Sequence, residues 1–446
     1  MSPRDSSKTV YIEHLGCAKN QVDLEVMGAR LQEAGWTWLD DPADAGLILV
    51  NTCGFIEPAQ EESIDTTLAL LAAHPGVPVA MTGCLAQRFS AELSEGMPEL
   101  AGIFGNREPD RIAEFVDRLS GGDCVVWLPE GREEPTDAPR SRLLSHPASA
   151  YVKIAEGCDH HCSFCAIPAI RGTLRVRSRT SVLKEFRELR QRGIHEFNLV
   201  AQDLAAWRDN SDGEGFLSLV DTLLAEPGEF WLRPLYLYPD QFPLELVRRS
   251  VQDPRLLPYF DLSFQHGSPE ILRRMGRPGT PEGYLELIAG IREINPDASL
   301  RSSFIVGFPG ETAEHLQQLT DFLAAATLEW VGVFEFSPQT GTGAAAIRKG
   351  VVPDSEKTRR RLLVESIQEP IVTARLTRHV GSHLPVLIEE RIQESDILLG
   401  RSPLQAPEVD GLVVVHHGGD AQPGHLIQVE ITGVTGVDMQ GRRIIF

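Results

Sequence analysis

Cysteine is scarce in this sequence, and long apolar runs are missing. Seven cysteines occur among 446 residues, an odd and sparse set that argues against a secreted protein held together by disulfides. The first eight residues are polar and charged, without the apolar core of a signal peptide. No uninterrupted apolar stretch is long enough to cross a bilayer. We therefore expect a cytoplasmic protein without membrane contact, whose thiols serve metal or redox chemistry.

Positive charge is also in short supply. The 42 lysines and arginines are outnumbered by 63 aspartates and glutamates, which gives a net charge of −21. So acidic a chain repels a polyphosphate backbone unless it concentrates a local basic patch, and it attracts basic partners. Composition therefore disfavours nucleic acid as a partner and favours a basic protein.

The length and the distribution of proline predict several domains. A chain of 446 residues is expected to form two to four of them. Residues 129–147 contain four prolines, many charges and no apolar period, which predicts a surface linker. A second boundary follows the charged helical stretch at 354–378. We place the domains at 1–128, 148–378 and 379–446.

The first and last domains differ in their patterns. The first has strand-like runs at 10–15, 47–50 and 77–81 with amphipathic helical stretches between them. Such alternation predicts a parallel sheet covered by helices, an α/β fold. From residue 386 onward, short β-type runs are separated by Gly, Pro and Asp, which is typical of a small β-barrel.

The middle domain repeats the strand–helix alternation on a larger scale. Its strand-like runs lie at residues 151–155, 197–201, 231–238, 260–264, 300–306 and 331–336. Six such units predict an incomplete (β/α) barrel, whose reactive edge is formed by the carboxyl ends of the strands. Polar or glycine-rich residues follow three of these runs, at 202–203, 265–267 and 307–311. Ordinary loop chemistry explains any one of them, but together with a metal motif they form a site hypothesis.

Three cysteines stand close together after the first strand of the predicted barrel. Cys158, Cys162 and Cys165 are separated by spacings of four and three, so their thiolates can converge on one metal centre. A four-iron cluster held by three cysteines leaves one iron open to an exogenous ligand. A structural zinc site is the alternative, but such sites use four ligands, and the downstream pair is missing. We expect His160 and His161 to be loop residues rather than ligands.

Three further cysteines occupy equivalent positions in the first domain. Cys17, Cys53 and Cys84 each follow a predicted strand and precede a predicted helix. In a parallel sheet such positions share one edge, where helix N-termini lower the pKa of a thiol and favour the thiolate. The pattern predicts a second three-thiolate cluster, and the alternative is three buried structural cysteines. Cys124 fits neither set and is expected to be a plain buried or free thiol.

These motifs together resemble a known family. The Cys-x-x-x-Cys-x-x-Cys loop, preceded by YVKIAEGC, is similar to the signature of radical S-adenosylmethionine enzymes. The upstream cysteines, in LGCAKN, NTCGFI and TGCLAQR, resemble those of the N-terminal domain of the methylthiotransferases, and the terminal β region resembles their TRAM module. The resemblance covers essentially the whole chain in the same order. It implies two 4Fe-4S clusters and S-adenosylmethionine as cofactors.

Shorter motifs favour one branch of that family. LGCAKN at 15–20, CAIPAIRG at 165–172 and APEVDG at 406–411 resemble the branch that modifies a ribosomal protein rather than the branch that modifies transfer RNA. One departure lies at 401–405, RSPLQ, where relatives more often carry an aromatic residue just before Ala-Pro; it bears only on local substrate contacts. The resemblance implies the basic small-subunit ribosomal protein S-twelve as substrate.

The chemistry that the resemblance implies attacks an unactivated C–H bond, at the β-carbon of an aspartate. No acid or base of a protein can do this, so the cofactors must. The barrel-loop cluster would bind and reductively cleave S-adenosylmethionine, and the other cluster would carry the sulfur. An electron donor and a sulfur donor are implied as partners. Gly307, Gly310 and Glu311 resemble the turn that cradles S-adenosylmethionine, and Gln202 and Asp203 lie where relatives contact it.

The charge of the last domain supports a protein substrate independently. Residues 381–446 contain four basic and nine acidic residues, a net of −5. An RNA-binding module is electropositive, whereas an acidic one suits a basic ribosomal protein. We therefore expect Glu408 and Asp410 to contribute to docking. Two alternatives stay open: the same reaction on a transfer-RNA adenosine, and a non-enzymatic iron–sulfur or zinc binding protein.

Overall fold

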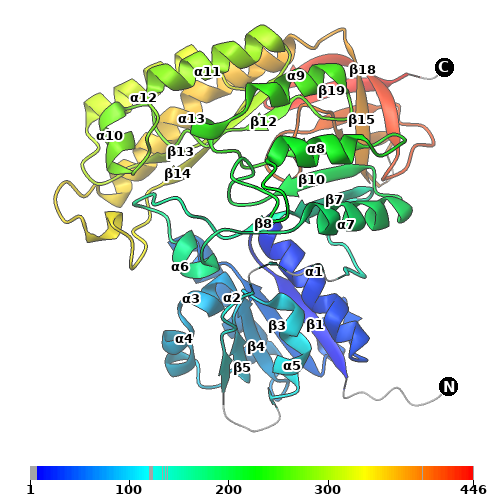
Figure 1. Ribbon diagram of the computed structural model, residues 1–446, viewed down its shortest axis with the longest axis vertical. Coiled ribbons are helices and arrows are strands. Elements are labelled where there is room, and N and C mark those ends of the chain that lie inside the picture. The colour runs from blue at the N-terminus through cyan, green and yellow to red at the C-terminus, as the bar shows by residue number, and fades with distance from the viewer. Residues whose placement is uncertain are drawn as a thin grey trace.

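The computed structural model describes residues 8–119, 124–132, 134–135, 137, 139–393 and 395–444. Figure 1 shows a blue-to-cyan α/β domain at the bottom, a green-to-yellow β/α domain above it, and an orange-to-red β-barrel at the upper right. This is the mixed α/β fold predicted from the sequence. Over the ranges given, none of the helices combines the length and the hydrophobicity that a membrane span requires.

The first domain is a parallel sheet with the strand order β2-β1-β3-β4-β5-β6. Its strands are β1 (Thr9–His14), β2 (Thr37–Leu39), β3 (Leu47–Thr52), β4 (Val79–Gly83), β5 (Gly102–Phe104) and β6 (Val125–Trp127). Its helices are α1 (Ala18–Glu33), α2 (Glu57–Ala73), α3 (Cys84–Arg88), α4 (Ser90–Gly96) and α5 (Ile112–Val116). The sequence predicted β1, β3 and β4. The other strands are three residues long, too short to carry a periodic pattern.

The central strands of this sheet are covered on both faces. Leu47 and Leu49 of β3 belong to one apolar core, whereas Ile48 and Val50 belong to the core on the opposite face. This division follows from the alternation of side chains along a strand. Because parallel sheets are covered by their connecting helices, β3 reads as a continuous apolar run in the sequence.

The middle domain is an open parallel barrel. Its strands are β7 (Ser149–Lys153), β10 (Glu196–Val200), β11 (Trp231–Pro234), β12 (Tyr259–Asp261), β13 (Ser299–Val306) and β14 (Trp330–Glu335). Sheets β11-β10-β7 and β12-β13-β14 are joined by parallel bridges from Leu232 to Leu256 and from Leu237 to Leu262. Within the described residues β14 does not pair with β7, so the barrel is incomplete, as predicted.

Helices cover the outside of this barrel (Figure 1). They are α7 (Arg179–Gln191), α8 (Phe216–Leu224), α9 (Leu244–Gln252), α10 (Pro269–Arg274), α11 (Pro281–Ile294), α12 (Ala313–Ala326) and α13 (Asp354–Thr377). A further short helix, α6 (Ile167–Arg171), lies at the boundary with the first domain, beside α3. A short antiparallel pair, β8 (Ala155–Glu156) with β9 (Arg175–Val176), follows β7. The loop that contains Cys158, Cys162 and Cys165 lies between β8 and β9. It therefore leaves the barrel just after the carboxyl end of β7, the first strand.

The last domain is a small closed barrel of strands in the order β15-β16-β17-β19-β18. The strands are β15 (His383–Arg391), β16 (Ile397–Arg401), β17 (Val413–His416), β18 (Leu426–Thr435) and β19 (Asp438–Arg443). Val386 and Met439 share one apolar core with Tyr151 and Tyr259 of the middle domain. The two barrels are therefore packed against each other.

Two acidic residues of the last domain were expected to dock a partner, and one of them does not. The side chain of Asp410 is only 1% exposed. It accepts hydrogen bonds from the Tyr259 hydroxyl at 2.6 Å and the Ala406 amide at 2.8 Å, and it lies 3.5 Å from Arg301 Nε. Asp410 therefore fastens the last domain to the middle one. Glu408 is exposed.

The segment expected to be a surface linker is anchored to both of the domains that it joins. Arg140 is buried, and its guanidinium contacts Glu25 Oε2 at 2.6 Å and Glu185 Oε1 at 2.5 Å. The amide of Leu144 donates to Glu25 Oε1 at 2.8 Å. This part of the linker therefore ties α1 to α7. Composition did not reveal it, because the charged residues that suggested solvent exposure are themselves the anchors.

Candidate functional site

Three cysteines lie along one edge of the first sheet. Cys17 precedes α1 directly, Cys53 follows β3, and Cys84 begins α3. The strands before them, β1, β3 and β4, are neighbours in the sheet. Because carboxyl ends of parallel strands share an edge, the three thiols are brought to the same rim. We call these residues the sheet-edge cysteines.

One amide side chain connects the three sheet-edge turns. Asn20 Nδ2 donates to the Leu15 carbonyl at 2.8 Å and to the Thr52 carbonyl at 3.2 Å. Asn20 Oδ1 lies 3.9 Å from the Cys84 sulfur. The positions of all three cysteines therefore depend on this residue of the LGCAKN motif.

A glycine with positive φ precedes Cys84, where the turn needs a left-handed conformation. Gly83 has a φ of +93°, and a Cβ there would lie 2.5 Å from the Thr52 carbonyl oxygen. The loop that begins at Cys158 has the same feature. Gly157, which precedes Cys158, has a φ of +84° and no room for a Cβ beside Thr173. Only glycine fits both requirements, so each turn presents its cysteine in a fixed direction.

Cys158, Cys162 and Cys165, which we call the barrel-loop cysteines, lie in a loop fixed to the barrel. The Cys158 amide donates to the Gly172 carbonyl at 3.1 Å, and the Cys165 amide donates to the Cys162 carbonyl at 3.1 Å. Arg277 Nη1 lies 3.9 Å from the Cys162 sulfur. The loop thus holds its thiols in place through its own backbone and presents one of them to a cation.

The sulfur of Cys84 is surrounded by donors. Arg171 Nη2 lies 3.2 Å from it and Asn106 Nδ2 lies 3.4 Å from it. In the barrel loop, the Ile167 amide donates to the Cys165 sulfur at 3.5 Å. Hydrogen bonds to sulfur stabilise negative charge on thiolate-held clusters and tune their potentials. The residues present therefore fit iron–sulfur clusters at both sets of thiols.

The two sets face each other across the domain boundary. Cys84 packs with Ala166 and Ile170 in one small apolar cluster, and Ala166 directly follows Cys165. Arg88 of α3 donates to the Thr340 carbonyl of the middle domain at 2.9 Å. The sheet edge is therefore docked against the barrel loop.

Cys53 and Cys84 do not have the lowered pKa values expected from helix N-termini. Burial raises the pKa of Cys53 to about 11, of Cys158 to about 11 and of Cys165 to about 12. The loss of hydration of the thiolate thus outweighs the effect of the helix ends. Cys53, Cys158 and Cys165 are therefore protonated near neutral pH and must release their protons when a metal binds.

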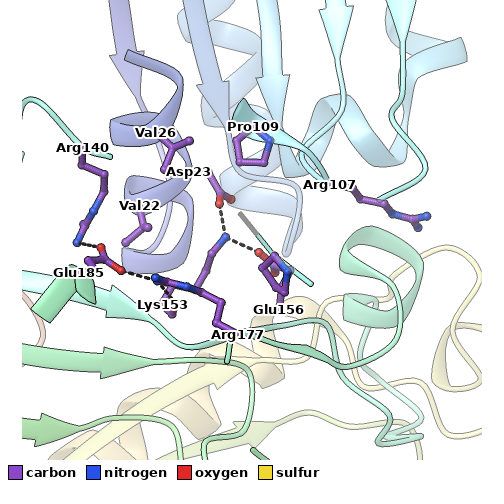
Figure 2. A pocket seen from close by; sticks show the side chains of 11 residues that line it. Val22, Asp23, Val26, Arg107, Pro109, Arg140, Lys153, Glu156, Arg177 and Glu185 are labelled. Carbon is purple, nitrogen blue, oxygen red and sulfur yellow. Dashed lines mark hydrogen bonds and ion pairs between the residues drawn. The ribbon is translucent and has the colours of Figure 1, made fainter. Parts of the chain in front are cut away.

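A network of buried charges lies between the two sets. In Figure 2 the Lys153 ammonium lies between the carboxylates of Asp23 and Glu156. Arg171 contacts the same carboxylates at 2.5 Å and 3.0 Å, and Gln202 Nε2 donates to Glu156 Oε1 at 3.0 Å. The cavity drawn there is about 20 Å³, room for one water molecule. It is therefore a structural junction rather than a ligand site.

The remaining predicted residues are engaged close to the barrel loop and the glycine-rich turn. Asp203 Oδ2 lies 2.8 Å from His160 Nε2 in the barrel loop, so it holds that loop. Gly307 and Gly310 have positive φ, +76° and +87°. Glu311 Oε2 accepts from the Gly307 amide at 2.5 Å, so its carboxylate stabilises its own turn.

No three Cys, His, Asp or Glu side chains in the described part of the chain are gathered tightly enough for a single metal ion. A four-iron cluster is much wider than one ion, so its thiolate ligands stay further apart. A closed zinc site needs four ligands around one ion, whereas each set supplies three thiols.

Comparisons with known proteins agree with the order of the domains. Residues 9–105 match a model described as uncharacterized protein family UPF0004, residues 152–323 match the radical SAM superfamily, and residues 380–444 match the TRAM domain. The "Ribosomal protein uS12 methylthiotransferase RimO" of Treponema denticola is 37% identical over 95% of this chain and 98% of its own. The protein of that name from a Synechococcus strain is 39% identical over 97% and 93%.

The chain belongs to the RimO family of methylthiotransferases. It is therefore a radical S-adenosylmethionine enzyme, and this class uses S-adenosylmethionine and a 4Fe-4S cluster. Among solved structures, the methyltransferase TsrM of Kitasatospora setae has a TM-score of 0.55 and 17% identity, over 76% of this chain and 77% of its own. That likeness shows a shared fold. The family resemblance read from the sequence is confirmed.

Several residues near the RimO-family cysteines were not assigned a role from the sequence. Asn20 and Arg171 lie within the motifs LGCAKN and CAIPAIRG, yet their contacts join segments far apart in the chain. Lys153 lies within the motif YVKIAEGC, whereas Asp23 and Arg277 belong to no motif used above. Their one sequence signal is a charged residue next to a strand or helix predicted to be buried.

Proposed function

We propose that this RimO-family chain holds two 4Fe-4S clusters and adds a methylthio group to the β-carbon of an aspartate in ribosomal protein uS12. The ligands would be Cys17, Cys53 and Cys84 for one cluster and Cys158, Cys162 and Cys165 for the other. The observation that carries this proposal is the docking of the two sets against each other, with Cys84 in contact with α6. Facing sites allow one substrate atom to be reached from both.

S-adenosylmethionine is proposed to lie at the mouth of the barrel. The turn around Gly307 and Gly310, which Glu311 braces and against which Lys357 and Arg274 pack, would lie beside the ligand. Gln202 and Asp203 follow β10 and hold Glu156 and the barrel loop, so they would position the ligand beside the barrel-loop cysteines. When bound, the clusters and S-adenosylmethionine would supply the radical that removes a hydrogen atom and the sulfur that replaces it.

The chain's own residues would orient these groups and exclude water. Arg171 and Asn106 would donate to the sulfur of Cys84, and Arg277 would stabilise negative charge at Cys162. The side chains packed around the barrel strands would keep solvent and other hydrogen-atom donors away from the substrate carbon.

The last domain supports a protein substrate. Each of its four arginines is already engaged within the described structure. Arg401 pairs with Glu196 and Glu389, Arg442 with Glu430, and Arg443 with Asp420, whereas Arg391 donates to carbonyls of 419 and 421. No free basic patch thus remains in this described barrel to attract a phosphate backbone. The net charge of −5 over residues 381–446 suits a basic protein.

The proposal also covers the domain boundaries, the cellular location and the donors of electrons and sulfur. The domains are placed at 1–128, 148–378 and 379–446, with 129–147 between them, and each family match falls within one of these domains. The reaction would take place in the cytoplasm, where ribosomal proteins are present. An electron donor would be needed to start it and a sulfur donor to repeat it.

The experiment is a reaction of the anaerobically reconstituted protein with S-adenosylmethionine and a reductant. Purified uS12 and transfer RNA are offered in separate tubes, and each is analysed by mass spectrometry after digestion. We expect uS12 to gain one methylthio group on one aspartate. A methylthio group on transfer-RNA adenosine and none on uS12 would replace the proposed substrate with RNA.

A further inference from the structure

A second cavity lies where the three domains meet. Its volume is about 270 Å³, close to the lower end of the range for small-molecule sites, about 300–1,000 Å³. The first domain contributes the loop of Cys17, the middle domain contributes Tyr151, Tyr236 and Tyr259, and the last domain contributes residues 406–409. The cavity is therefore adjacent to the sheet-edge cysteines, large enough for a side chain, and formed only when the three domains are assembled.

Two of the motifs that resemble the protein-modifying branch border this same cavity. Gly16, Cys17 and Ala18 belong to LGCAKN, and residues 406–409 belong to APEVDG. These segments are nearly 400 residues apart in the chain, so their meeting here is a property of the fold. A cavity lined by both is the place at which the choice between a protein and an RNA substrate would be made.

One cation beside the cavity has no anionic partner. Lys19 Nζ lies 3.4 Å from the centroid of the Tyr236 ring, and in the described residues it makes no ion pair or hydrogen bond. Arg301, which lines the cavity, is instead held by Asp261 at 3.4 Å and Asp410 at 3.5 Å. Lys19 is thus the cation available to an incoming anion.

The backbone around the cavity is strained at two positions. Tyr236 has a φ of +64° and Glu408 has a φ of +68°, and both line the cavity. Non-glycine residues in this conformation cluster at ligand sites, where the surrounding structure holds them. The left-handed turn at Tyr236 presents its ring to Lys19, which fixes the direction of the ammonium.

We propose that this cavity receives the aspartate side chain of the protein substrate and that Lys19 binds its carboxylate. This inference rests on the function proposed above. A cation–carboxylate contact is a charge-assisted hydrogen bond, stronger than a neutral one. Lys19 is two residues from Cys17, so a carboxylate bound there brings its β-carbon to the sheet edge. An adenine base carries no anionic group, so a base placed in this cavity would leave Lys19 without a partner.

The test uses the full-length reconstituted protein and purified uS12, without S-adenosylmethionine so that no turnover occurs. The wild-type reaction first identifies the modified aspartate, and a uS12 variant with Asn at that position is prepared. Binding is measured by titration for wild type, Lys19→Met and Lys19→Arg. The control is Lys184→Met, at an α7 position where the side chain is 61% exposed.

We expect Lys19→Met to weaken binding of uS12 about tenfold, the usual effect of losing a hydrogen bond to a charged group. Lys19→Arg should keep most of the affinity, and Lys184→Met should bind like wild type. Iron content and substrate-free cleavage of S-adenosylmethionine should be unchanged in Lys184→Met. The Asn variant of uS12 should bind wild type about tenfold more weakly, with no further loss on Lys19→Met.

The results separate two failures. If wild type modifies uS12 but Lys19→Met binds it equally well, or the two changes weaken binding additively, Lys19 does not bind the carboxylate. The Asn variant of uS12 tests the same contact without altering the enzyme, so a folding defect in Lys19→Met does not obscure the answer. If wild type does not modify uS12, the proposed function itself is wrong.

Discussion

The two sets of cysteines are assembled in opposite ways. The barrel-loop cysteines lie within residues 158–165, and their backbone is held by contacts of that loop with its own neighbours, such as the 3.1 Å hydrogen bond from Cys165 to Cys162. The sheet-edge cysteines are spread over residues 17–84 and meet because β1, β3 and β4 are adjacent. One set is therefore specified by local sequence and the other by the order of strands in a sheet.

This difference has consequences for how each set responds to change. The barrel loop depends on its own turns, on Asp203 and on Arg277. The sheet edge depends on the whole first domain, on Asn20, and on Arg171 from the other side of the boundary. The two should therefore be separable by mutation where the changes are local, and coupled where the changes touch the junction.

The largest effect is expected from the barrel loop. The triple replacement of Cys158, Cys162 and Cys165 by Ala should remove about half of the roughly eight irons expected for two four-iron clusters. It should also abolish reductive cleavage of S-adenosylmethionine, because the open iron that binds this cofactor is lost. Iron analysis and product chromatography check both outcomes. A triple variant with full iron content would show that this loop is not a cluster site.

The matching replacement of Cys17, Cys53 and Cys84 by Ala should have a narrower effect. About half of the iron should be lost and no methylthio product should form, yet S-adenosylmethionine should still be cleaved. The expected reason is that the barrel loop keeps its own anchors. Mass spectrometry of uS12 and the cleavage assay are run on the same preparation. Methylthiolated substrate from this variant would rule out a sulfur-carrying role for the sheet edge.

The junction should couple the two sets. Arg171→Met leaves Asp23 and Glu156 buried with Lys153 as their one remaining cation, and removing one partner of a buried charge network costs about 3–5 kcal/mol. We expect a lower free energy of unfolding in denaturant titration and weaker iron loading at Cys84. Adding Asp23→Asn restores neutrality and should recover part of the stability. If Arg171→Met is as stable as wild type, the network does not join the domains.

Much of this site could be predicted from the sequence, and the rest could not. The spacing of the barrel-loop cysteines is local, and the sheet edge follows from the strand–Cys–helix pattern together with the rule for parallel sheets. The contacts of Arg171 with Asp23 and Cys84 depend on docking of two domains, which no local pattern encodes. The expected lowering of the thiol pKa was wrong for Cys53 and Cys84, because burial is a property of the folded chain. Asp410 was misjudged for the same reason.

Smaller effects should come from the glycines that precede a cysteine in each set. Gly83→Ala places a Cβ 2.5 Å from the Thr52 carbonyl oxygen, and Gly157→Ala places one against Thr173, both at positive φ. Such strain costs about 1–3 kcal/mol. We expect Gly83→Ala to lower iron at the sheet edge while sparing cleavage of S-adenosylmethionine, and Gly157→Ala to impair cleavage.

The matched control for these two glycines is Gly35→Ala. Gly35 also has a positive φ, +87°, but nothing lies within 4 Å of its added Cβ. It should therefore cost only the backbone strain, leave the iron content unchanged and spare both reactions. If either glycine variant impaired both sets equally, the sets would not be independent outside the junction.

The smallest effect is expected at the seventh cysteine. Cys124 precedes β6 rather than following it, so in a parallel sheet it lies at the edge opposite to the sheet-edge cysteines. Its side chain is partly buried against the core that includes Ile48 and Ile103. Cys124→Ser should change the free energy of unfolding by about 1 kcal/mol or less, with iron content and cleavage of S-adenosylmethionine as in wild type. Loss of iron would show that Cys124 is a ligand. Position at the carboxyl edge of the sheet would then not decide which cysteines bind a cluster.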